Sequence, residues 1–121
     1  MSYNNPNTVQ QIINKINCHK DFTYNLDDNN PISNYKYIVS VKNIFVNRYI
    51  NDVTNLRDLI QDALNDVYKF ESIGLWYDKK DDVFCLDGNL HFYNLQNALN
   101  VAKLCEQKAI FDIKNNSVIT L

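Results

Sequence analysis

Three segments of the chain place apolar residues at the three- and four-residue spacing of a helix face. They span residues 7–17, 54–70 and 94–107. The apolar stripe of the first segment is Val9, Ile12, Ile13 and Ile16. The N-caps expected from residue type are Asn7 or Thr8, then Thr54, then Asn94. The pattern therefore predicts three helices.

Runs of β-branched and aromatic residues between these segments predict strands. The predicted strands are 21–25, 35–42, 44–50, 72–78, 83–86, 108–113 and 117–121, with a short extended piece at 90–93. Turns are expected at Asn43, at 79–82, at Asp87-Gly88 and at Asn115-Asn116. The last strand, SVITL, is expected to form an exposed edge.

Most of these strands are joined by hairpins, so the sheet should be mainly antiparallel. We predict an α+β fold with two to three helices packed on one face of the sheet. The 121 residues suit one domain, 1–121, in which residues 1–20 form an N-terminal helix at the periphery.

The charge and composition of the chain restrict the kinds of partner and the cellular location that we expect. The 14 acidic and 12 basic residues give a net charge of −2, without the basic excess of a nucleic-acid-binding protein. No apolar run approaches the roughly 20 residues of a membrane helix, and no signal peptide is expected. Three widely spaced cysteines argue against a disulfide framework and for reduced thiols. We expect a cytoplasmic protein that contacts neither nucleic acid nor membrane directly, as a monomer or weak homodimer.

Few residues suggest catalysis or a cofactor. Two glycines cannot build a phosphate-binding loop. The cysteines and histidines do not show the spacing of a metal site, so no metal or other cofactor is expected. Cys85 and His91 flank the predicted turn at Asp87-Gly88, which leaves a small Cys/His enzyme as an alternative.

Acidic residues form the clearest surface pattern. On the predicted 54–70 helix, Asp58, Asp62 and Asp66 recur one turn apart and share a face. Such a row is either a solvated helix face or an anionic patch that meets a basic surface. The predicted hairpin tip adds Asp78, Asp81 and Asp82 to the candidate binding residues.

Two adjacent aromatic residues are the other candidates for contact with a partner. Trp76 and Tyr77 should face opposite sides of their strand, one in the core and one exposed beside the acids. An exposed aromatic side chain there would suit an interface anchor.

Several segments resemble known proteins. They are D-F-T-Y-N, Y-K-Y-I-V-S-V-K, G-L-W-Y-D, V-F-C-L-D, N-L-Q-N-A-L-N-V-A-K and Q-K-A-I-F-D-I-K-N, within residues 21–116. Together they resemble small proteins of phages and mobile elements of the anti-CRISPR type. The resemblance implies a stoichiometric inhibitor of a type II CRISPR effector nuclease, bound as protein or guide-loaded complex in a host bacterial cell. Such effectors hold nucleic acid in a positively charged channel, which an acidic surface could occupy. The main alternative is a phage protein that binds another host or defence protein.

Overall fold

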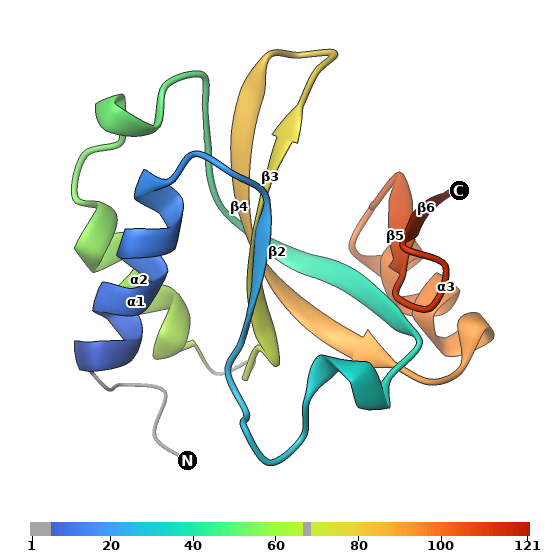
Figure 1. Cartoon of the computed structure of the whole chain (residues 1–121). Helices are drawn as coiled ribbons and strands as arrows, with labels where there is room; N and C mark the ends of the chain where they lie inside the picture. Colours follow the sequence, from blue (N-terminus) through green and yellow to red (C-terminus); the bar gives the residue numbers. More distant parts are fainter. Residues whose placement is uncertain (1–5, 67–68) are drawn as a thin grey trace.

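The computed structural model describes residues 6–66 and 69–121, which form a six-stranded sheet with three α-helices (Figure 1). The strands are β1 Phe22–Asn25, β2 Tyr37–Asn47, β3 Ser72–Asp78, β4 Val83–Phe92, β5 Ala109–Asp112 and β6 Ser117–Thr120. The helices are α1 Pro6–Asn17, α2 Leu56–Leu64 and α3 Leu95–Leu104, with short 3₁₀ turns at Ile32–Asn34 and Ile50–Asp52. The sheet order is β1-β3-β4-β2-β5-β6, and all neighbours are antiparallel, so the predicted α+β class is confirmed.

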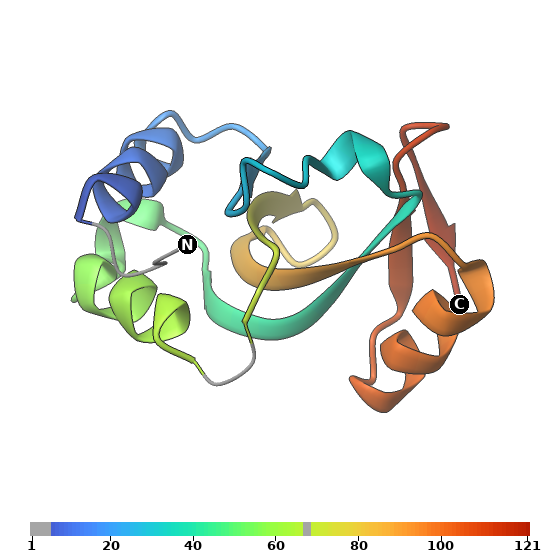
Figure 2. The same ribbon diagram turned by 90° about the horizontal axis from the view of Figure 1, so that it is seen from below.

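The helices lie in two groups along the curled sheet (Figure 2). At one end, α1 and α2 pack on each other and on the sheet. Their main core cluster is Val9, Ile12, Ile16, Leu26, Phe45, Ile50, Ile60, Ala63, Leu64, Phe70, Ile73, Leu75 and Leu86. The predicted stripe of α1 is thus part of the core, and this helix is not peripheral. At the other end, α3 packs on a smaller cluster of Val39, Ala98, Ala102 and Ile110.

Strand register shows that all three helices cover the same face of the sheet. Val39 pairs with Leu90, and Phe45 pairs with Leu86, so these four side chains share one side of β2 and β4. Val39 belongs to the core cluster beneath α3, and Phe45 and Leu86 belong to the cluster beneath α1 and α2. The opposite side, which we call the open face, carries no helix among the described residues.

Two predicted turns are wrong because the chain continues as strand. Asn43 lies inside β2, which two irregularities bend without ending it. Asp87 and Gly88 lie inside β4, which also includes residues 90–92 of the extended piece predicted at 90–93. Gly88 is there to make room, because a Cβ at this position would lie 2.7 Å from the Phe70 ring.

Helix ends also differ from the predictions. Asn7 and Thr8 lie within α1, which begins at Pro6. The residue before α2 is Asn55, with φ of 55° and no side-chain cap, so Thr54 is not the N-cap. Asn94 is confirmed as the cap of α3, since it accepts a hydrogen bond from the Asn97 amide at 3.1 Å. None of the described helices has the length and apolar character needed to cross a membrane.

Candidate binding surface on the open sheet face

The open face is built from residues of all six strands. The residues on this face include Thr23, Ile38, Ser40, Asn43, Ser72, Gly74, Trp76, Cys85, Asp87, Asn89, His91, Phe111 and Val118. The irregularities in β2 keep Ser40 and Asn43 on this face although they are three residues apart. Strict alternation of side chains along β2 would place these two residues on opposite faces, so it does not predict this arrangement.

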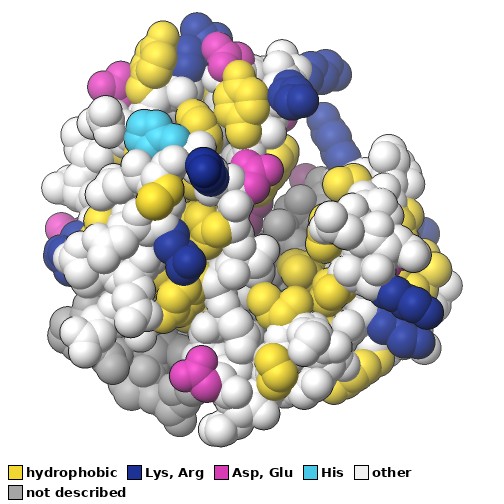
Figure 3. Space-filling view, viewed as in Figure 1, with side chains coloured by type: hydrophobic (Ala, Val, Ile, Leu, Met, Phe, Trp, Pro, Cys, Tyr) yellow, Lys and Arg dark blue, Asp and Glu magenta, His cyan; other side chains and the backbone are white. Residues whose placement is uncertain are grey.

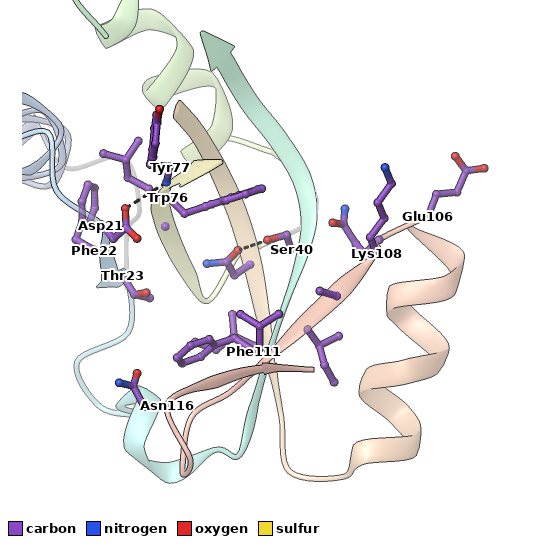
Figure 4. Close-up of a pocket in the computed structure, with 18 residues that line it drawn as sticks. Asp21, Phe22, Thr23, Ser40, Trp76, Tyr77, Glu106, Lys108, Phe111 and Asn116 are labelled. Atoms are coloured by element: carbon purple, nitrogen blue, oxygen red, sulfur yellow. Dashed lines mark hydrogen bonds between the residues drawn. The ribbon is translucent and has the colours of Figure 1, made fainter. Parts of the chain in front are cut away.

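A groove of about 780 Å³ occupies the middle of this face. Ser40, Gly74 and Asn89 form its floor. Trp76 and Thr23 line it from β3 and β1, while Phe111 lines it from β5 on the other side (Figure 4). In the space-filling view, hydrophobic side chains follow the hollow between the two parts of the molecule (Figure 3). The volume is typical of a ligand site, and the mixture of aromatic walls and polar floor is typical too.

Asp87 anchors the polar side chains of the groove floor. Its Oδ2 accepts from Trp76 Nε1 at 2.6 Å and from Ser40 Oγ at 3.2 Å. Its Oδ1 accepts from Asn43 Nδ2 at 2.9 Å. Asp87 is only 6% exposed, and no described lysine or arginine forms an ion pair with it. The Trp76 indole is therefore fixed by a buried carboxylate that has only neutral donors around it.

The hydrogen bonds continue from this carboxylate along β4. Ser40 Oγ also lies 3.2 Å from Asn89 Oδ1, and Asn89 Nδ2 donates to Ser72 Oγ at 3.1 Å. His91 Nε2 lies 2.8 Å from the same Ser72 hydroxyl. The resulting network connects three strands beneath the groove and holds its polar floor in one arrangement.

His91 and Cys85 do not form a catalytic pair. Both face the open side of the continuous strand β4, six residues and about 20 Å apart. Burial lowers the pKa of His91, against a smaller opposing effect of Glu71, and the buried Nδ1 has no hydrogen-bond partner among the described residues. Burial raises the pKa of Cys85 to about 11. The thiol is therefore far from an activated nucleophile, and the predicted turn that would bring these two residues together does not form.

Trp76 and Tyr77 face opposite sides of β3, but neither is in the core. Trp76 is 43% exposed and Tyr77 is 37% exposed, because this end of the hairpin extends beyond the helices. The expectation that one of them is buried is wrong. Tyr77 packs on Phe84 with ring centroids 5.1 Å apart and donates its hydroxyl to Asp82.

The hairpin tip is confirmed at 79–82, but its carboxylates mostly serve local structure. Asp78 accepts from the Lys80 and Asp81 amides at 2.9 and 3.3 Å. Asp82 forms an ion pair with Arg48 at 3.4 Å. With Lys79 and Lys80 beside them, cationic and anionic side chains intermix over this end (Figure 3). The tip is not a uniformly acidic patch.

The predicted acidic row on the second helix is broken. Asp58 and Asp62 are exposed on α2. Asp66 lies beyond the end of the helix at Leu64, and its carboxylate forms an ion pair with Lys42 at 2.5 Å, with 11% of the side chain exposed. Val67, part of the same predicted helix, lies outside the described residues. The helix ends early, so the spacing of one turn does not reach Asp66.

Sequence reasoning missed Asp87, Asn89, Ser40 and Gly74 as members of a site. The signal was present in the alternation of polar and apolar residues along 85–92. The prediction of a turn at Asp87-Gly88 divided this segment, so the alternation was not recognised as one strand. Within residues 6–66 and 69–121, no group of three or more histidine, cysteine or acidic side chains is placed to hold a metal ion.

Comparisons with known proteins provide no relative for this chain. No protein-family model, no curated protein and no solved structure matches it.

Proposed function

We propose that this protein acts by binding another protein through the open face of its sheet. The observation that carries the proposal is Trp76, a partly exposed indole fixed by buried Asp87 at the wall of a large groove. Tryptophan is among the residues that dominate binding energy at interfaces, and a side chain already held in place loses little entropy on binding.

The target we propose is a type II CRISPR effector nuclease, which the protein would inhibit stoichiometrically. The support is the sequence resemblance together with carboxylates that line the groove, such as Asp21. An effector that reads DNA presents arginine side chains and a positively charged channel. Trp76 would supply affinity, and the carboxylates would favour the encounter.

A cleavage assay tests this target directly. A purified effector–guide complex is titrated with the protein, and cleavage should stop near equimolar protein. The Trp76→Ala variant should lose at least about tenfold in potency, as expected for a central anchor. Tyr49→Ala is the matched control, since Tyr49 is 61% exposed away from the groove.

Two outcomes would contradict the proposal. Undiminished cleavage at excess protein by several type II effectors would exclude the target and favour another host or defence protein. Inhibition that survives Trp76→Ala but not Asp58→Lys would place the binding surface on α2 instead of the open face.

A further inference from the structure

Gly74 leaves a hollow in the groove floor beside the Trp76 ring. It lies between Thr23 and Asp87 in the cross-strand register, and its backbone does not have a positive φ. A glycine is therefore not required here by conformation. A Cβ at this position would lie 3.1 Å from Asn89 Nδ2, 3.6 Å from the Phe22 carbonyl oxygen and 3.9 Å from Thr23 Oγ1. Even a Cβ would therefore crowd the Asn89 amide, and because Gly74 has no side chain the groove reaches the backbone at this point, next to the Trp76 ring.

The electrostatics of this hollow are negative. Asp87 is directly opposite Gly74 in the register and is buried without a cation among the described residues. Asp87 does not line the groove itself, so its charge would act on a cation in the groove from beneath the Trp76 and Ser40 side chains that donate to it. Asp21 adds a second carboxylate at the same end of the groove (Figure 4). Lys108 lies at the far end, beside the opposite charge of Glu106 (Figure 4).

We propose that this hollow binds an arginine side chain presented by the partner protein. The inference rests on the proposed protein-binding function and names the group that the groove recognises. The guanidinium stacks on the Trp76 indole and enters the space above Gly74. Asp87 stabilises its charge from below, while Ser40 Oγ, the Phe22 carbonyl and Asp21 are the acceptors within or beside the hollow.

Arginine fits this site better than lysine for two reasons. The guanidinium is planar and stacks on an aromatic face, whereas an ammonium is a compact and more strongly hydrated point charge. Its five N–H donors can reach several acceptors arranged around a shallow space. The indole is held by Asp87 before binding, so its face is available without a change of rotamer.

Peptide titrations of the intact protein, followed by NMR, test the proposal. The probes are acetyl-Gly-Arg-Gly-amide and the same peptide with lysine or with citrulline, which is arginine's neutral analogue. The chain has a single tryptophan, so the Trp76 indole N–H signal reports the site without ambiguity. We expect the arginine peptide to shift this signal with Kd of about 1 mM. The citrulline peptide should bind at least about fivefold more weakly, with lysine between them.

Two variants test the residues. Asp87→Asn removes the charge with little change of shape, and Gly74→Ala fills the hollow; both should weaken arginine binding about fivefold or more. If Asp87→Asn fails to fold, the proposal is tested by the effect of Gly74→Ala on arginine binding. Equal binding of the arginine and citrulline peptides would overturn the proposal. An unmoved Trp76 signal or unchanged binding by folded variants would do the same.

The two proposals fail separately. The peptide titration contains no effector, so arginine recognition can stand when effector inhibition is absent. Conversely, inhibition that depends on Trp76 without arginine selectivity would keep the proposed function and exclude the guanidinium site.

Discussion

Replacing Gly88 by alanine should destabilise the protein markedly, although alanine normally stabilises an extended strand. A Cβ at Gly88 would lie 2.7 Å from Phe70 Cδ2 and Cγ and 2.8 Å from Cδ1, against roughly 3.5–4 Å for ordinary carbon contacts. Neither the β4 backbone nor the Phe70 ring can move away easily. β4 is paired with strands on both sides, and Phe70 is 2% exposed in the main core cluster.

The magnitude follows from two opposing effects. Overpacking of this kind costs about 1–3 kcal/mol. Replacing glycine restricts the unfolded chain and returns about 0.4–1 kcal/mol. We expect a net loss of about 1–2 kcal/mol in the free energy of unfolding, or roughly 4–8 °C in Tm for a domain of this size.

Urea denaturation followed by circular dichroism measures this loss. Gly74→Ala is the milder comparison, since its nearest neighbour is the Asn89 amide at 3.1 Å in place of ring carbons at 2.7 Å, and it should cost at least about 1 kcal/mol less than Gly88→Ala. Phe70→Leu should recover at least about 1 kcal/mol of the Gly88→Ala loss in a double-mutant cycle. A stable Gly88→Ala variant, or strictly additive effects of the two substitutions, would refute the reasoning.

Three further predictions concern titration, reactivity and ion pairing. Burial lowers the pKa of His91 in the folded protein. The contribution of neutral His91 to the free energy of unfolding is therefore complete above the unfolded-state pKa of 6.5 and declines as the pH falls below it. His91→Gln should flatten this part of the plot of unfolding free energy against pH. Exposed Cys18 should react with iodoacetamide in the native protein at neutral pH, whereas buried Cys85, with its pKa raised to about 11, should react only after unfolding, as peptide mass mapping would show. Asp66→Asn should cost about 0.5–1 kcal/mol by removing the ion pair with half-exposed Lys42, whereas Asp62→Asn on exposed α2 should cost less than about 0.5 kcal/mol; equal losses in chemical denaturation would contradict this distinction.

The local sequence pattern accounts for much of the fold. The stripe of α1, the strand 72–78 and the cap at Asn94 were predictable because each depends on residues near in sequence. The edge position of β6 was also predictable, since the last hairpin leaves its final strand with one neighbour.

The errors share a physical cause in long-range contacts. Asp87-Gly88 has the composition of a turn, yet β2 and β3 pair with it on both sides and Phe70 packs over the glycine. The acidic row fails for a similar reason, because Asp66 pairs with Lys42, 24 residues away along the chain.

The sequence by itself determined the types of element, their order and which side of each helix is apolar, because these depend on hydrophobic spacing and capping within a few residues. The sequence also predicted that the helices pack on one face of the sheet; only the tertiary structure decided which strand residues lie on the face that they leave open. It also brought Ser40, Gly74, Trp76 and Asp87 together. These residues come from three strands, and the register that aligns them is set by core packing and by the irregularities of β2, which a local pattern does not contain.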